Sequence, residues 1–166
     1  MANETVIDAS VFMGMHSRDE ALRLSCKRFF AKRLDHRLVM SLEDVGRCDN
    51  LVWRFPRDTQ DAYYPFMDNL HTDAEIHRVG YDEDDVRIAL ESPRLADLLM
   101  HERLLLGMVL RRQAVLYTAS PRLRDRMDLP ARAVPTGGNV SPSDFPGQLE
   151  QLYQQSLALR VVPEDL

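Results

Sequence analysis

Short apolar segments that alternate with helical segments constrain the fold of this chain more than any other feature. Apolar residues gather at 6–7, 37–40 and 114–118, the segment 76–80 alternates in the manner of a strand, and a helix-start signal follows each of these segments. Strands that alternate with helices predict a parallel sheet with helices on both faces. We therefore expect a three-layer α/β/α fold with a mostly parallel central sheet of four or five strands.

Capping residues and prolines set the limits of the expected helices. Ser17 with Glu20 three residues later is a capping-box pattern, and Ser41 repeats the N-cap signal after the second strand. Pro56 ends the second helix, and Pro65 starts a new segment or kinks the helix that contains it. The sequence predicts helices over about 17–32, 41–55, 57–74 and 93–112, one that begins in the acidic segment 81–85, and a last one over about 145–160.

The composition divides the chain into an α/β domain over 1–128 and an extension over 129–166. The turn-forming residues of the extension are Pro130, Pro135, Gly137, Gly138, Pro142 and Pro146. Such a stretch predicts loops, with one edge strand near 131–134. We expect the terminal helix to pack across the sheet or on a partner subunit.

A helical hairpin over 44–74 is predicted to be an insertion in the α/β domain. Its aromatic residues are Trp53, Phe55, Tyr63, Tyr64 and Phe66. The first interpretation is a hairpin that packs on itself. The alternative is a surface for a protein partner, because an exposed apolar hairpin face needs to be covered.

The composition also bounds the class of protein. No segment approaches the roughly 20 apolar residues of a membrane span, so we expect a cytoplasmic protein with no membrane contact. The net charge of -5 argues against a basic nucleic-acid coat, although the clustered carboxylates of a nuclease would add negative charge. Basic residues group at 27–33 and 122–126, as solvated faces or as phosphate-binding patches. Cys26 and Cys48 lack neighbours at metal-ligand spacing, so reduced thiols are expected.

Acidic residues in three places are candidates for a metal site. Asp8 ends the first strand, and Glu43 and Asp44 open the helix after the second, at the carboxyl edge where ligands bind parallel sheets. Asp8 is also a plausible N-cap, but Ser17 is the stronger cap for the first long helix. Glu102 lies on the predicted long helix and is the third candidate. Carboxylates that converge there would bind hard cations such as Mg²⁺ or Mn²⁺.

Asp97 and His101 are weaker candidates near Glu102. On one continuous helix, Asp97 and Glu102 would lie about 140° apart and could not point into one site. His101 is either a borderline metal ligand or an exposed or hydrogen-bonded histidine.

The acidic segments resemble those of the PIN domain, a small metal-dependent ribonuclease fold. Residues 6–10 (Val-Ile-Asp-Ala-Ser) resemble its opening strand motif, and residues 41–45 resemble the start of its second helix. Glu102 with the apolar residues after it, and the segment 115–120, resemble its long helix and fourth strand. The likeness spans about residues 2–126 and implies an Mg²⁺- or Mn²⁺-dependent ribonuclease that acts on RNA and forms a homodimer.

The resemblance implies roles for individual residues. Asp8, Asp44 and Glu102 would hold the metal and catalyse cleavage, and Ser10 would support Asp8. The chain departs from the family pattern, because Asp44 stands where glutamate is usual and Glu102 where aspartate is usual. Ser120 occupies the position of the fourth acid, or else begins a short helix with the proline that follows it.

A wider pattern around His16, Asp49 and Tyr64 is similar to an uncharacterised actinobacterial PIN-like family associated with natural-product gene clusters. These three residues are secondary site candidates, and their structural alternatives are a loop residue, a helix-surface residue and a residue of the hairpin core. The first functional hypothesis is the ribonuclease. The others are a PIN-like binding or accessory protein without catalysis, which uses the aromatic hairpin, and a small-molecule metalloenzyme of a biosynthetic pathway.

Overall fold

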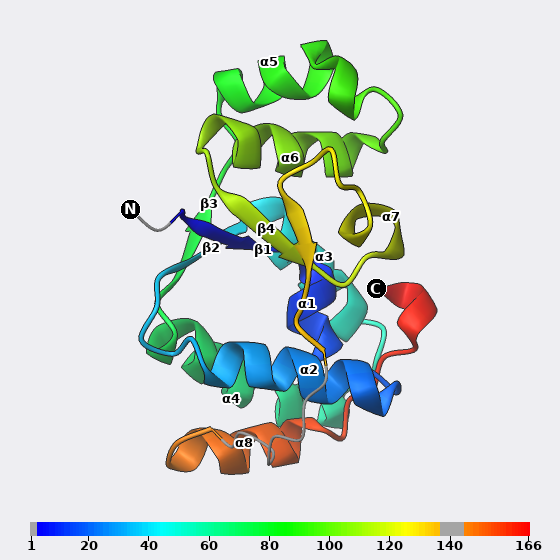
Figure 1. Cartoon of the computed structure of the whole chain (residues 1–166). Coiled ribbons are helices and arrows are strands. Elements are labelled where there is room, and N and C mark those ends of the chain that lie inside the picture. The colour runs from blue at the N-terminus through cyan, green and yellow to red at the C-terminus, as the bar shows by residue number, and fades with distance from the viewer. Residues whose placement is uncertain (1–2, 137–144) are drawn as a thin grey trace.

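A five-stranded sheet lies at the centre of the molecule (Figure 1). The computed structural model describes residues 3–136 and 145–166, so the predicted turn residues Gly137, Gly138 and Pro142 lie outside the described residues. The strands are β1 (Thr5–Ile7), β2 (Leu38–Ser41), β3 (Ile76–Val79), β4 (Val115–Thr118) and β5 (Ala131–Ala133). Their order is β3-β2-β1-β4-β5 and every neighbouring pair is parallel. The predicted three-layer α/β/α class is confirmed, and β5 brings part of the 129–166 extension into the same sheet.

Helices cover both faces of this sheet (Figure 1). The α-helices are α1 (Ala9–Gly14), α2 (Glu20–Ala31), α3 (Leu42–Val52), α4 (Arg57–Asp73), α5 (Glu83–Glu91), α6 (Met100–Arg111), α7 (Pro121–Arg124) and α8 (Gln148–Ser156), with short 3₁₀ helices η1 (Pro93–Leu95) and η2 (Pro163–Asp165). Helices α5 and α6 lie on one side of the sheet, and α1, α2, α4 and α8 lie on the other (Figure 1).

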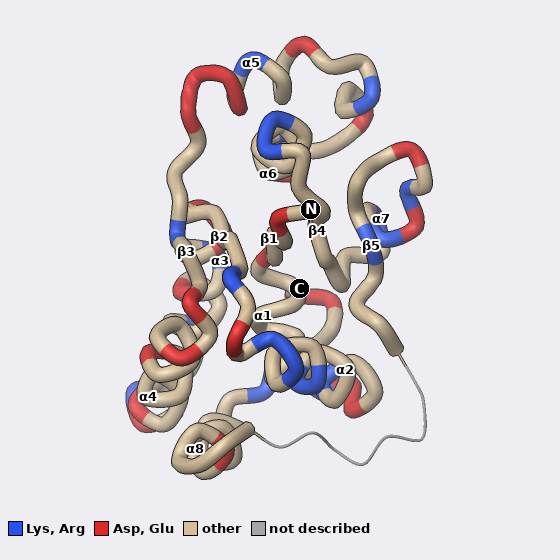
Figure 2. Tube along the Cα trace, turned by 60° about the vertical axis from the view of Figure 1, so that its left-hand side comes forward, with Lys and Arg blue, Asp and Glu red and all other residues tan. Residues whose placement is uncertain are grey.

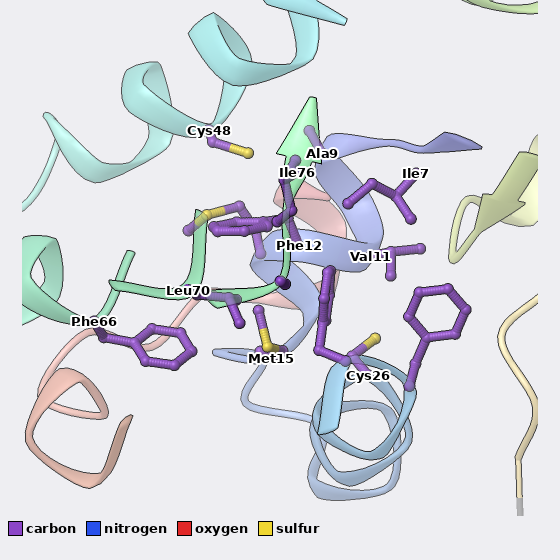
Figure 3. Close-up of a cluster of buried hydrophobic side chains, with 14 of the residues drawn as sticks. Ile7, Ala9, Val11, Phe12, Met15, Cys26, Cys48, Phe66, Leu70 and Ile76 are labelled. Carbon is purple, nitrogen blue, oxygen red and sulfur yellow. The ribbon is translucent and has the colours of Figure 1, made fainter. Parts of the chain in front are cut away.

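Successive strand residues contribute to two separate hydrophobic cores, because strand side chains alternate between the faces of a sheet. Val6, Val39 and Leu116 join the core beneath α6. Ile7 and Met40 join the larger core that also contains residues of α1, α2, α3, α4 and α8, part of which is drawn in Figure 3. Strands buried on both faces are typical of all-parallel sheets, which explains why β1, β2 and β4 are mostly apolar, whereas the edge strand β3 exposes His77 and Arg78.

The first helical region differs from the prediction. Ser17 is not the N-cap of α2: Asp19 is the cap, and its carboxylate accepts a hydrogen bond from the Leu22 N–H (3.3 Å). The Ser17 hydroxyl instead accepts from the Asp19 N–H (3.0 Å), which fixes the turn before the helix. A short helix, α1, precedes this turn and was not predicted; Asp8 is its N-cap. Asp8 therefore does cap a helix, and the prediction that Ser17 takes over this role is wrong.

The prediction of one continuous helix over 93–112 is also wrong, because the structure divides this segment in two. The chain forms η1 after Pro93, turns, and begins α6 only at Met100. The Arg103 guanidinium donates to the carbonyl groups of Leu95 (2.9 Å) and Ala96 (3.3 Å), so a side chain of α6 satisfies backbone groups that a continuous helix would have paired. Helix α4, by contrast, continues through Pro65, so the alternative in which Pro65 starts a new helix is wrong.

The aromatic residues of the predicted hairpin divide between the core and the surface. Tyr63 and Phe66 are buried, whereas the Trp53 side chain is 65% exposed. The rings of Tyr63 and Phe66 contact His16, and Phe66 also contacts Tyr153 of α8. Helix α4 thus packs on α8 and on the turn after α1, rather than mainly back onto α3.

Candidate functional site

The carboxyl edge of the sheet borders a cavity of about 420 Å³. The sheet order places β1 in the centre, with β2 on one side of it and β4 on the other. The strand order therefore reverses at β1, which makes this position a topological switch point. Open parallel sheets bind ligands at such a point. The cavity is lined by Asp8, Ala9, Ser10, Asp44, Arg47, Asn50, Leu51, Arg54, Leu99, His101, Glu102, Leu105, Ser120, Arg122, Leu123, Glu164, Asp165 and Leu166. All three acids predicted to form the main site, Asp8, Asp44 and Glu102, are among these residues.

Asp8 is held by hydrogen-bond donors at the end of β1. Its Oδ1 accepts from the Ser10 hydroxyl (2.6 Å) and from the Val11 N–H (3.1 Å), the second of which caps α1. Its Oδ2 accepts from the Thr118 hydroxyl at the end of β4 (2.5 Å). The Asp8 residue is only 5% exposed. Two donors from α1 and one from the end of β4 thus fix the orientation of one carboxylate, and the Ser10 hydroxyl is one of them.

Asp44 reaches the same place from the first turn of α3. Ser41 is the N-cap of this helix, as predicted, and accepts a hydrogen bond from the Asp44 N–H (3.0 Å). The Ser41 hydroxyl donates to Asp44 Oδ2 (2.7 Å), while Asp44 Oδ1 accepts from the N–H of Ala9 (3.0 Å). Because Ala9 follows Asp8 directly, this bond ties the two acidic segments together.

The electrostatics of this pair are dominated by burial. Burial, followed by the charge of Asp44, raises the pKa of Asp8 from an ordinary value of 3.8 to about 6, although the bonds from Ser10, Thr118 and Val11 oppose the rise. Burial likewise raises the pKa of Asp44, against the bonds from Ser41 and Ala9. The carboxylate pair consequently carries a free-energy cost when ionised, and a positively charged ligand would relieve it.

Glu102 has a different environment on the other side of the cavity. The Arg122 guanidinium of α7 donates to Glu102 Oε1 (2.8 Å) and Oε2 (3.4 Å), and the Leu99 N–H donates to Oε2 (3.0 Å) at the start of α6. Glu102 is 4% exposed, whereas the Arg122 side chain is 53% exposed. The Glu102 charge is thus paired within the chain, and Arg122 is held at the cavity by a buried partner.

The carboxylate oxygens of Asp8 and Asp44 fit a cation that is held by two acids, rather than one that is held by three. Across residues 3–136 and 145–166, no group of three or more His, Cys, Asp or Glu side chains is arranged to hold a metal ion. Magnesium, however, keeps several waters in proteins and commonly takes only one or two carboxylates together with substrate oxygens. Asp8 and Asp44, buried and with raised pKa values, have the chemistry of such a site.

The secondary candidates separate into two groups. Ser10, His101 and Ser120 line the cavity, and the Ser120 N–H donates to the Thr118 hydroxyl (3.0 Å) as Pro121 begins α7. The other five do not line it. Glu43 accepts from Tyr81 (3.4 Å), Asp49 accepts from Tyr64 (3.2 Å), Asp97 pairs with Arg126 (2.9 Å), and His16 is buried against Ser156 (2.8 Å).

The model of a family of unknown function (DUF6190) matches residues 1–166. The chain belongs to this family. No curated protein matches it. Within the described residues, no helix is long and apolar enough to cross a membrane.

Several residues at or beside the cavity of this DUF6190 chain were not predicted from its sequence. Thr118 ends β4 and bonds Asp8, and its place beside Ser120 at a strand end was the available signal. Arg47 lies on α3, on the same helix as Asp44, and Arg54 lies two residues after the end of that helix. The acidic residues Glu164 and Asp165 could not have been found, because nothing in the sequence places that segment beside β1.

Proposed function

We propose that this chain is a divalent-metal-dependent hydrolase of phosphodiester bonds. The observation that carries the proposal is the buried Asp8–Asp44 pair, which faces a cavity that arginine residues also line. Asp8 and Asp44 would hold Mg²⁺ or Mn²⁺. When bound, such an ion polarises a phosphoryl oxygen and lowers the pKa of a coordinated water. The PIN-like ribonuclease implied by the sequence resemblance is one member of this class.

The residues of the chain supply binding and orientation around that position. Arg122 uses part of its guanidinium on Glu102, and the planar fork of an arginine has further N–H groups that suit phosphate oxygens. Glu102 therefore acts as a positioning residue for Arg122 in this proposal. Arg47 and Arg54 add positive charge to the cavity from the side of α3. Hydrolysis adds water across one P–O bond, so that the products are an alcohol and a phosphate monoester.

Hydrolysis of bis(p-nitrophenyl) phosphate tests the proposal. The full chain is freed of metal with EDTA and assayed with and without Mn²⁺. We expect turnover only with metal, and a loss of at least about 100-fold for Asp8→Asn, the upper end of the cost of losing even a residue that supports a metal ligand. Asp97→Asn is the matched control, because Asp97 is exposed and pairs with Arg126 outside the cavity. Metal-independent turnover, or equal turnover by Asp8→Asn, contradicts the proposal.

A second candidate is a binding protein without catalysis, and the Glu102–Arg122 ion pair favours it. Because the Glu102 charge is already paired with the Arg122 guanidinium, Glu102 is not free to help hold a metal. Titration calorimetry separates the two candidates. Heat on addition of Mn²⁺, lost in Asp8→Asn, supports the hydrolase, whereas no heat at millimolar Mn²⁺ supports the binding protein.

A further inference from the structure

A segment far from the acidic residues in sequence closes one side of their cavity. Glu164, Asp165 and Leu166 line it together with Asp8 and Asp44. Figures 1 and 2 both place the C mark close to α1, the helix that Asp8 caps, and Figure 2 shows acidic positions beside that mark. Residues 161–166 are here called the closing segment.

The closing segment is held in place by the backbone. The Val161 N–H donates to the His16 carbonyl (2.8 Å), and the Val161 carbonyl accepts from the Arg18 N–H (2.8 Å), which gives a parallel bridge between Val161 and Ser17. Val161 is 2% exposed, and Leu166 packs against the larger core. The segment is consequently a fixed part of the fold.

Helix α8 fixes the chain that leads into the closing segment. Its Tyr153 hydroxyl donates to the Met15 carbonyl (2.8 Å), and Ser156 is hydrogen-bonded to His16 (2.8 Å). Lys27 of α2 forms an ion pair with Glu150 (2.6 Å), although Lys27 is only 4% exposed. These contacts all join α8 to the turn after α1 or to α2, so the closing segment and the Asp8 site share one support.

The size and charge of the cavity favour a compact ligand. A volume of about 420 Å³ lies in the lower part of the range of about 300–1,000 Å³ that small-molecule sites occupy. Proteins that bind single-stranded nucleic acid use a positively charged groove that follows the backbone over several nucleotides. Here the lining, among the residues that the structure describes, holds five carboxylate side chains, of which Glu164 and Asp165 belong to the closing segment, against three arginines, in a chain whose net charge is -5. A polyanion that left the cavity on the side of the closing segment would meet these two carboxylates.

We infer that the closing segment makes the site selective for a short phosphodiester and excludes a long polynucleotide. The inference rests on the proposed hydrolase for its reaction, but it concerns access to the cavity and is measurable without hydrolysis. Glu164 and Asp165 are the residues that determine this selectivity. They repel the additional phosphates of a long substrate, while a substrate with one phosphate fits between them and the Asp8–Asp44 pair.

The experiment compares two substrates that contain the same bond, the dinucleotide adenylyl-3′,5′-adenosine and a twelve-residue oligoadenylate. The variant Glu164→Lys/Asp165→Lys, called the wall variant, reverses the charge of the closing segment at these two positions. Its matched control is Asp73→Lys/Glu91→Lys, which makes the same change of net charge at two exposed residues outside the cavity. Hydrolysis is measured with Mn²⁺, and binding of fluorescein-labelled oligoadenylate is measured by anisotropy in EDTA.

We expect the unmodified chain to favour the dinucleotide by about 10-fold or more in kcat/KM per bond. The wall variant should raise oligoadenylate affinity by about 10-fold, raise oligoadenylate hydrolysis relative to dinucleotide hydrolysis by about 10-fold, and exceed the control variant in both measurements. Equal use of both substrates by the unmodified chain overturns the inference, as does a gain in oligoadenylate binding that the control variant matches. If neither the unmodified chain nor any variant hydrolyses either substrate, the proposed hydrolase function is contradicted. The binding measurement then still decides whether the closing segment excludes the oligoadenylate.

Discussion

Replacing Asp8 with asparagine should stabilise the metal-free protein at pH 8 while it removes a residue needed for the proposed activity. Burial and the Asp44 charge raise the pKa of Asp8 from 3.8 to about 6. At about 1.4 kcal/mol per pKa unit, ionised Asp8 costs the folded state about 3 kcal/mol. An asparagine has one acceptor oxygen instead of two, so the Thr118 bond changes partner, at a cost of about 1 kcal/mol. The expected net gain in the free energy of unfolding is about 2 kcal/mol.

The gain should depend on pH with a definite sign. The folded-state pKa is raised, so the folded protein takes up the Asp8 proton at a higher pH than the unfolded chain does. The cost of ionised Asp8 is complete above pH 6 and disappears as the pH falls from about 6 toward 4. The advantage of Asp8→Asn over the unmodified chain should therefore shrink by more than about 1 kcal/mol between pH 8 and pH 5.

Urea unfolding followed by far-UV circular dichroism, in EDTA at both pH values, measures this advantage. Asp19→Asn is the matched control, because Asp19 is also a helix N-cap but is exposed to solvent. Asparagine caps a helix about as well as aspartate, so this control should change the free energy of unfolding by less than about 0.5 kcal/mol. A lower stability of Asp8→Asn at pH 8, or an equal advantage at both pH values, would show that the ionised Asp8 carboxylate does not destabilise the folded state.

Two further substitutions test the support around the site by the same unfolding assay. Gly107→Ala should lower the free energy of unfolding by about 2 kcal/mol, because its Cβ would lie 2.5 Å from the Asp85 carbonyl oxygen where α5 meets α6. The control Gly46→Ala, whose Cβ would have nothing within 4 Å, should be neutral or slightly stabilising. Equal losses of stability in the two variants would contradict this packing. Thr118→Val removes a donor that lowers the pKa of Asp8, so it should destabilise the chain more at pH 8 than at pH 5. An equal loss at both pH values would show that Thr118 does not stabilise the ionised carboxylate.

The sequence determined the class of fold and the edge of the sheet where the acids lie. Continuous apolar segments predicted strands buried on both faces, and the parallel sheet places their carboxyl ends together. Asp8 and Asp44 meet for that reason, since each follows a neighbouring strand. Local capping was predictable where the signal was unambiguous, as at Ser41, but not at Ser17, where Asp19 offered a second cap two residues later.

Only the tertiary structure decided the partners of the acids and the walls of the cavity. Glu102 meets Arg122 because α6 begins at Met100 and α7 follows β4, a distance of 20 residues along the chain. The closing segment reaches Asp8 because α8 packs on α4 and on the turn after α1, which no local pattern encodes. Sequence periodicity reports which side of an element is buried, whereas the identity of the neighbour depends on how distant elements pack. The acidic pair is thus a property of strand order, and its selectivity a property of packing.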